Sequence, residues 1–158
     1  MSQAREAAIV GIHEYPSRDV EGEVSALQIK AESAARALED AGLNWSDVDA
    51  IYDAGEGGGM MSGLTISEYF GLRPDVIDTT AVGGTSFEFH AAHARRDIAA
   101  GRAKVALLTY GSTAKSNRMA IGVGGRGGGG AHPAENMDTF AGMTLIANYA
   151  MVAHRHMH

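Results

Sequence analysis

Cysteine is absent from the 158-residue sequence. Its absence excludes disulfide bonds, zinc sites built on thiolates and a thiolate nucleophile. Long apolar runs are absent too: the sequence has no stretch of about 18 apolar residues, so a membrane-spanning helix is not expected. Residues 1–12 become apolar too briefly for a signal peptide and lack the pattern of a cleavage site. We therefore expect the cytoplasm as the compartment.

Basic residues are fewer than acidic residues. The chain carries 13 Lys and Arg residues against 19 Asp and Glu residues, which gives a net charge of −6 with histidine neutral. Nucleic acids and anionic membranes are bound by basic surfaces, so neither partner is expected. Hydrophobic residues make up 45% of the chain and charged residues 20%, which is typical of a globular protein. The length is that of one domain.

Glycine, in contrast, is abundant, with 21 residues, many of them clustered. Glycine supplies tight turns, so the clusters predict loops. Between them, apolar runs predict strands, and apolar stripes at helical spacing predict amphipathic helices. Gly42 is expected to cap the first helix in the left-handed conformation. Strands are expected at 7–12, 49–54, 76–82 and 105–110, and helices at 24–41, 62–71 and 86–100.

The alternation of these strands with helical crossovers predicts an α/β fold, with a mainly parallel sheet and helices on both faces. The strand at 105–110 is apolar enough to be buried on both of its faces. After this strand the sequence is polar and glycine-rich up to residue 137, and helical spacing returns at 138–157. We therefore divide the chain into an α/β core at 1–112 and a second part at 113–158.

One stretch carries most of the functional information: TTAVGGTSFEFHAAHARRDIAAGRAKVALLTYGS, residues 79–112. Its order of strand, Gly-Gly, hydroxyl residues, helix and strand resembles the part of a thiolase in which the nucleophilic cysteine opens a buried helix. A helix N-terminus carries about half a positive charge, which favours a thiolate there. Counting back from the turn at Gly101 places Thr85 at the cysteine position. An offset of one residue would place Gly84 or Ser86 there.

The resemblance to the thiolase superfamily extends over the chain. Residues 37–55 (ALEDAGLNWSDVDAIYDAG) resemble a helix-turn-strand passage near the start of the thiolase fold. Residues 110–117 (YGSTAKSN) resemble the start of its loop domain, and residues 140–157 (FAGMTLIANYAMVAHRHM) resemble an early helix of that domain. The segment GGTSFEFHAAHA, residues 83–94, is most similar to cysteine-less thiolase-like proteins of the sterol-carrier and lipid-transfer type. Some of these are aldolases that cleave steroid side-chain CoA thioesters together with a small partner protein.

This resemblance implies a thiolase-like N-terminal half, mainly parallel in its sheet, followed by the start of a loop domain. It implies catalytic roles for Thr85, Ser86 and His90 and an oxyanion-binding role for Gly83 and Gly84. The implied substrate is a coenzyme A thioester, with no covalently bound cofactor and no metal. The implied reaction is retro-aldol or Claisen-type cleavage of a C–C bond in a lipid or steroid CoA thioester. The family's second half is missing, so we expect the chain to be inactive alone.

The resemblance also implies partners: a homodimer formed through the strand at 76–82, and a small protein with an OB fold or a zinc ribbon. Two other functions stay open. The first is a non-catalytic thiolase-like subunit that binds acyl-CoA or a partner chain. The second is a thiolase acyltransferase, which the missing cysteine disfavours.

The candidate residues also have structural interpretations, which we favour. Thr85 and Glu88 have the spacing of a capping box, in which the hydroxyl accepts from a helix N–H and the glutamate reaches back. His90 and His93 are three residues apart and share one face of the helix. They are either acid–base groups or histidines held by hydrogen bonds in the core or at an interface.

Several further patterns are weaker. Residues 122–127 (GVGGRG) match GxGxxG, but no strand precedes them and no helix can follow, so a dinucleotide site is not predicted. The loop at 55–59 follows a strand but lacks the lysine and hydroxyl of a phosphate-binding loop. The alternating histidines at 154–158 predict a surface tail rather than a zinc site. Three arginines are candidates for binding the phosphates of CoA: Arg95, Arg96 and Arg102. The favoured alternative is that they are solvent-exposed residues at the end of a helix.

Overall fold

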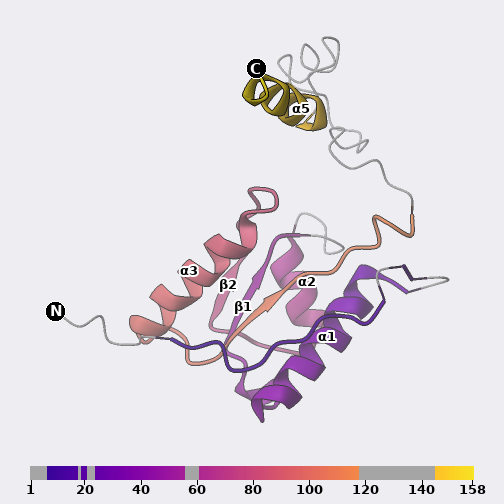
Figure 1. Ribbon diagram of the computed structural model, residues 1–158. Helices are drawn as coiled ribbons and strands as arrows, with labels where there is room; N and C mark the ends of the chain where they lie inside the picture. The colour runs from indigo at the N-terminus through magenta and orange to yellow at the C-terminus, as the bar shows by residue number, and fades with distance from the viewer. Residues whose placement is uncertain (1–6, 18, 21–23, 56–60, 118–144) are drawn as a thin grey trace. The chain divides into compact units, whose positions relative to one another are not determined.

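The computed structural model describes residues 7–17, 19–20, 24–55, 61–117 and 145–158. The chain divides into two compact units, residues 1–116 and residues 117–158. In the described part of the first unit the elements are α1 (Ala26–Ala41), the 3-10 helix η1 (Trp45–Asp47), β1 (Ala50–Asp53), α2 (Ser62–Tyr69), β2 (Val76–Asp78), α3 (Ser86–Ala99) and β3 (Ala106–Thr109). The second unit contains α5 (Leu145–His156) (Figure 1).

The three strands form a parallel sheet in the order β2-β1-β3. Ala50 pairs with Val76 on one side and with Ala106 on the other. The strands are short, but each follows a helical crossover, which is the connection that parallel neighbours require. The prediction of an α/β fold with a mainly parallel sheet is therefore confirmed for the described residues.

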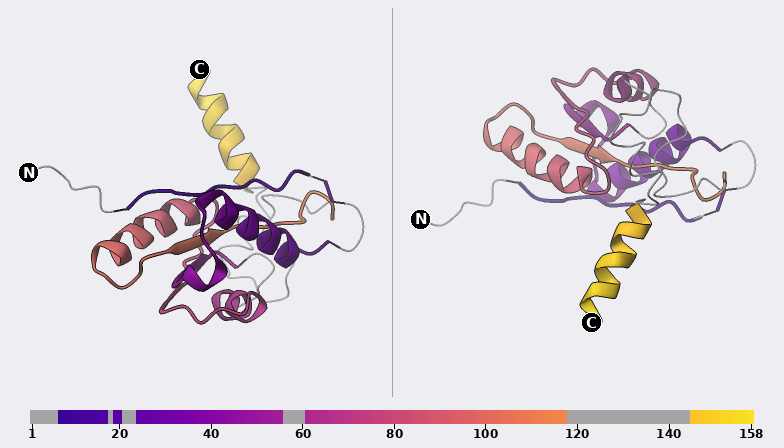
Figure 2. Two further views of the ribbon diagram at one scale, coloured as in Figure 1. Left: turned by 90° about the horizontal axis from the view of Figure 1, so that it is seen from below. Right: turned by 90° about the horizontal axis from the view of Figure 1, so that it is seen from above.

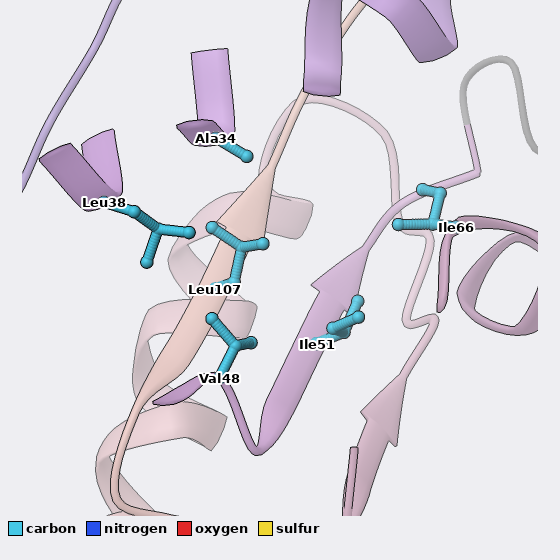
Figure 3. Packing of buried hydrophobic residues seen from close by; sticks show 6 residues of the cluster. All are labelled: Ala34, Leu38, Val48, Ile51, Ile66 and Leu107. Carbon is cyan, nitrogen blue, oxygen red and sulfur yellow. The ribbon is translucent and has the colours of Figure 1, made fainter. Parts of the chain in front are cut away.

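Helices cover both faces of this sheet. On one face, side chains from α1, α2, β1, β3 and the link between η1 and β1 form a core in which they point toward one another (Figure 3). Its buried members are Ala34, Leu38, Val48, Ile51, Ile66 and Leu107. On the other face α3 packs on the sheet through a second core, whose buried members are Ala50, Tyr52, Ala94 and Ala103. The layers are thus helix, sheet, helix.

The ends of α1 follow from its sequence. Ser25 and Gln28 form a reciprocal capping box at its start, which satisfies two backbone N–H groups that the helix leaves open. At its end Gly42 has a φ of 68°, the left-handed conformation predicted from its place after the apolar stripe.

Residues 7–12 do not form the predicted strand. They are extended without strand pairing, and the side chain of Ile9 is 86% exposed. The segment is held against α1 instead: the backbone N–H of Ile12 donates to Asp40 at 3.0 Å. A Cβ on Gly11 would stand 2.1 Å from the carbonyl oxygen of Ala37. The predicted strand is absent because no strand in the described part of the chain adjoins this apolar run.

Two further strand predictions need correction. The strand at 76–82 is shorter, because β2 ends at Asp78 and only an isolated bridge joins Val82 to Gly84. The strand at 105–110 is not buried on both faces, since Leu108 is 38% exposed. The reason is its place at the edge of the sheet, where one side of β3 has no neighbouring strand among the described residues.

The helix predicted at 138–157 is present as α5 from Leu145 onward. His154 and His158 lie on one face of this segment, with ring centroids 4.7 Å apart. Residues 122–127 and nearly all of the loop at 55–59 lie outside the described residues, and the division at 112/113 stays a prediction. Within the described residues, no helix has the length and apolar character needed to cross a membrane.

Candidate functional site

The candidate site is the turn that joins β2 to α3, because parallel strands present their carboxyl ends at one edge of the sheet. Asp78 closes β2 and organises the start of this turn. Its Oδ1 accepts from the backbone N–H of Thr80 at 2.8 Å and from the Thr80 hydroxyl at 2.7 Å. Asp78 thereby fixes the direction in which the chain leaves the sheet.

The turn ends at Ser86, where α3 begins, as the sequence predicts. The Ser86 hydroxyl donates to the carbonyl oxygen of Gly83 at 2.6 Å and accepts from the N–H of Val82 at 2.9 Å. Ser86 is fully buried, and Gly83 has a φ of 78°, which a residue with a side chain adopts at a cost. Ser86 therefore links the turn to the helix, and its hydroxyl already donates one hydrogen bond and accepts another.

The predicted capping box at Thr85 is wrong. The Thr85 side chain accepts no hydrogen bond from α3. Its hydroxyl points back along the turn and donates to the carbonyl oxygen of Val82 at 3.3 Å. Thr85 has helical backbone angles, φ −80° and ψ −1°, whereas a capping residue has an extended backbone. The Thr85 side chain is consequently exposed and free of a capping role.

His90 reaches from the second turn of α3 back to the same loop. Its Nε2 lies 2.9 Å from the carbonyl oxygen of Thr80. A carbonyl oxygen can only accept, so Nε2 carries the proton. The imidazole is fully buried against Tyr52 and Phe87, with ring centroids 6.0 Å away in both cases. Its Nδ1 is buried and has no hydrogen-bond partner among the described residues.

His93 makes the second link between α3 and the end of β2. Its Nδ1 lies 2.5 Å from Asp78 Oδ2. Burial acts to raise the pKa of the Asp78 carboxyl, but the hydrogen bonds from Thr80 and His93 outweigh it and the pKa is lowered. His90 and His93 do share one helix face, as predicted, and both hold the turn by hydrogen bonds.

The lowered pKa of Asp78 predicts an acid-sensitive contribution to folding. A carboxyl whose pKa is lower in the folded state stabilises the protein above its unfolded pKa of about 3.9, and the benefit disappears as the pH falls through the folded pKa. Asp78→Asn should therefore lower the free energy of unfolding at pH 7, and its deficit should shrink toward pH 3. Urea titrations followed by the fluorescence of Trp45, the single tryptophan, would measure both values. A deficit that does not change with pH would contradict this assignment.

Open hydrogen-bond donors gather where α3 begins. Within the described residues, the backbone N–H groups of Phe87 and Glu88 have no hydrogen-bond partner, and that of Gly84 has none beyond the isolated bridge to Val82. The helix N-terminus adds about half a positive charge at this point. Glu88 in the first turn places one negative charge nearby. The arrangement can accept a neutral carbonyl group and stabilise negative charge that develops on its oxygen.

The structure separates the five predicted site residues into two groups. Gly83, Gly84 and Thr85 form the exposed surface of the turn, whereas Ser86 and His90 are buried beneath it. The His90 imidazole contacts the Thr80 carbonyl, and no hydrogen bond joins it to the hydroxyl of Thr85 or of Ser86 in the described part of the chain. A hydroxyl nucleophile needs a base within hydrogen-bond reach, which neither hydroxyl has there.

A charged pair that no sequence motif marks lies at the same end of the strands. Lys30 on α1 and Asp53 at the end of β1 are both fully buried, and Lys30 Nζ lies 2.6 Å from Asp53 Oδ2. The Thr109 hydroxyl at the end of β3 donates to the same oxygen at 2.9 Å, and the N–H of Gly55 donates to Oδ1 at 2.8 Å. Asp53 in an otherwise apolar strand was the available signal, since a buried charge requires a partner.

A second set of polar contacts, near the C-terminal end of α3, holds this helix to the sheet. The buried Tyr52 donates from its hydroxyl to Asp97 at 2.6 Å, and Asp97 also pairs with Arg102. Hydrogen bonds from Tyr52 and Arg102 lower the pKa of Asp97. Burial and the contact with Asp97 raise the pKa of Tyr52. Of the arginines considered for CoA phosphates, Arg102 thus has an acidic partner.

Comparison with known proteins adds a likeness of fold. No family model matches the chain, and no curated protein matches it. A solved structure, an Ltp2-ChsH2 (DUF35) aldolase, is similar with a TM-score of 0.51 and 23% sequence identity. The similarity covers 67% of this chain and 27% of that chain, so this chain spans well under half of the aldolase chain's length. At this identity the likeness shows a shared fold and nothing finer.

Proposed function

We propose that the chain is the N-terminal part of a cysteine-less, thiolase-like acyl-CoA enzyme that cleaves a C–C bond in a lipid or steroid CoA thioester. The observation that carries the proposal is the exposed turn Gly83-Gly84-Thr85, which opens α3 with unpaired N–H donors at the carboxyl end of the sheet. The likeness of fold to an aldolase structure supports it.

The proposed reaction is a retro-aldol cleavage of a 3-hydroxyacyl-CoA. A base removes the proton of the 3-hydroxyl group, and the new C=O bond forms as the bond between C2 and C3 breaks. The electron pair of that bond passes into the thioester as an enolate, which then takes a proton at C2. Fixed donors around the thioester oxygen lower the barrier because they meet charge that develops only during this step.

Each site residue has a distinct role in this proposal. The N–H groups at Gly84 and at the first turn of α3 bind the thioester oxygen, and Thr85 contacts the acyl group. Ser86 and His90 are positioning residues, because the Ser86 hydroxyl and the His90 Nε2 hold the turn. The base comes from outside the described residues, and a free coenzyme A thioester is the substrate.

Two partners belong to the proposal. A second copy pairs through residues 76–82, where Ile77 is 39% exposed on the free edge of β2 and Val82 is 52% exposed. A small partner protein with an OB fold or zinc ribbon contributes to the full enzyme. The name of the similar structure joins two components, which supports an assembly of this kind.

The donor site can be tested with the full chain by comparing two ligands. One is a plain acyl-CoA, and the other is a CoA analogue that carries an anionic nitronate in place of the thioester enolate. Calorimetric titration should show the nitronate binding at least about tenfold more tightly, since an enolate-stabilising site prefers the charged form. Gly84→Pro removes one N–H and should abolish most of this preference.

Gly84→Ala is the matched control, because it keeps the N–H and its Cβ would have no atom within 4 Å. Equal binding of both ligands, or a preference that survives Gly84→Pro, would overturn the proposed role of the turn. Intact-mass measurement after acyl-CoA exposure should show no adduct. A covalent adduct on Thr85 or Ser86 would favour acyl transfer over aldol chemistry.

A non-catalytic subunit is the second candidate. The occupied hydroxyl of Ser86 and the absence of a described base beside Thr85 favour it. Such a subunit would bind the acyl-CoA and the nitronate with equal affinity, so the same titration separates the two functions.

A further inference from the structure

Two histidines and a methionine gather on one face of the chain at the C-terminal end of α5. His154 follows Met151 by three residues and precedes His158 by four, which is the spacing of neighbours on a helix surface. The N–H of Met157 still donates to Ala153, so the helical course continues beyond the last residue of α5. Figure 2 shows α5 from two sides, in yellow, as one unbroken helix.

The three side chains surround one hollow on the surface of this helix. Its lining consists of Ala150, Met151, His154, Arg155 and His158, all of which are exposed. In the described part of the chain, neither imidazole has a hydrogen-bond or ion-pair partner. Both rings can therefore turn a nitrogen toward a ligand in the hollow.

The two imidazole rings have the separation that one shared metal ion requires. Their centroids are 4.7 Å apart. A metal–nitrogen bond of about 2.0–2.1 Å places the centroid of a bound ring about 3 Å from the ion. Two rings that meet at the ion between a right angle and the tetrahedral angle therefore have centroids about 4.4–5.1 Å apart. The observed separation lies within this range.

The charges around the hollow favour a cation of low charge. The open carbonyl groups at the end of a helix carry about half a negative charge, which attracts cations. The Arg155 guanidinium lines the same hollow and opposes them. Its repulsion is about twice as strong for a divalent ion as for a monovalent one. A monovalent ion consequently fits this position better.

The methionine decides which metal the three side chains suit. A thioether is a soft ligand that selects copper(I), and imidazole also binds copper well. Zinc in proteins takes thiolate, imidazole and carboxylate ligands. Within the described residues, no group of three His, Cys, Asp or Glu side chains could hold a metal ion together. Two imidazoles beside one thioether thus favour copper(I) over zinc(II).

We propose that Met151, His154 and His158 bind one copper(I) ion at the C-terminal end of α5. The thioether sulfur and one nitrogen of each imidazole are its three protein ligands. The ion bridges two successive turns and holds the end of the helix together. This inference does not depend on the proposed enzymatic function, because no residue of the first unit takes part.

Copper(I) itself tests the proposal on the full chain, without oxygen and with ascorbate present. The protein should withdraw one equivalent of copper(I) from its coloured complex with ferrozine, which the loss of absorbance measures. Zinc(II), measured with a fluorescent zinc indicator, should bind at least about tenfold more weakly. In ¹³C-methyl NMR spectra, copper(I) should shift the methyl signal of Met151 and leave that of Met61 in place.

Single substitutions identify the ligands. His154→Ala should weaken copper(I) binding at least about tenfold, because the ion loses one of its three ligands. Met151→Leu should weaken copper(I) binding and leave zinc(II) binding unchanged, because zinc gains little from a thioether. The matched controls are His156→Ala, outside the hollow, and Met61→Leu on an exposed side chain of the first unit. Both should keep the affinity of the wild type.

Four results would overturn the proposal. The first is a wild-type chain that withdraws no more copper(I) than a variant in which His154 and His158 are both alanine. The second is an equal loss with His156→Ala, which would assign binding to the histidines regardless of their face. The third is full affinity in Met151→Leu, and the fourth is zinc(II) binding as tight as that of copper(I).

Discussion

Asp53→Ala is expected to lower the free energy of unfolding by about 3–5 kcal/mol, because it leaves a fully buried lysine without its counter-charge. The same change also removes the acceptor of the Thr109 hydroxyl and of the Gly55 N–H. A small domain has a total stability of about 5–15 kcal/mol, so this variant should unfold at much lower urea concentrations. Urea titration followed by Trp45 fluorescence measures the change.

A matched pair of controls separates charge burial from the general effect of losing an acidic residue. Glu39→Ala breaks an ion pair with Arg36 whose side chains are 71% and 60% exposed, and it should change stability little. Replacing both buried charges with apolar residues, Lys30→Met with Asp53→Leu, should restore much of the loss because no unpaired charge remains. An Asp53→Ala variant as stable as Glu39→Ala would refute the buried pair.

Ile51→Ala is expected to cost about 2–5 kcal/mol, because it opens a cavity where the surrounding side chains cannot all collapse. Ile51 is fully buried at the centre of β1, among the side chains shown in Figure 3. Ile77→Ala makes the same chemical change on β2, where the side chain is 39% exposed, and should cost far less. Chemical denaturation of both variants gives the comparison, and equal losses would contradict the described core.

The order of elements was predictable because it depends on local signals. The apolar stripe of α1 and the glycine at position 42 gave the helix and its left-handed end, and both are present. Residues 7–12 show the limit of such signals. An apolar run favours a strand, but strand pairing depends on which neighbour the fold supplies, and α1 rather than a strand holds this segment.

The candidate site was predictable in position but not in hydrogen bonding. The sequence placed the start of α3 at Ser86 and grouped His90 with His93. It could not show that the Ser86 hydroxyl bonds within the turn, or that Thr85 turns away from the helix it precedes. The ion-pair partner of Asp53 could not be predicted either, because Lys30 lies 23 residues earlier and only tertiary packing brings the two together.

The parallel pairing of β1 with β3 has a consequence for the time course of folding. The Asp49 carboxylate accepts from the N–H of Val105 at a separation of 56 residues, so the contact requires closure of a long loop. Chains rich in such distant contacts reach the native state slowly compared with helical bundles. During synthesis, one edge of β1 stays unpaired until β3 has left the ribosome. In that interval the unpaired strand edge makes the nascent chain prone to aggregation.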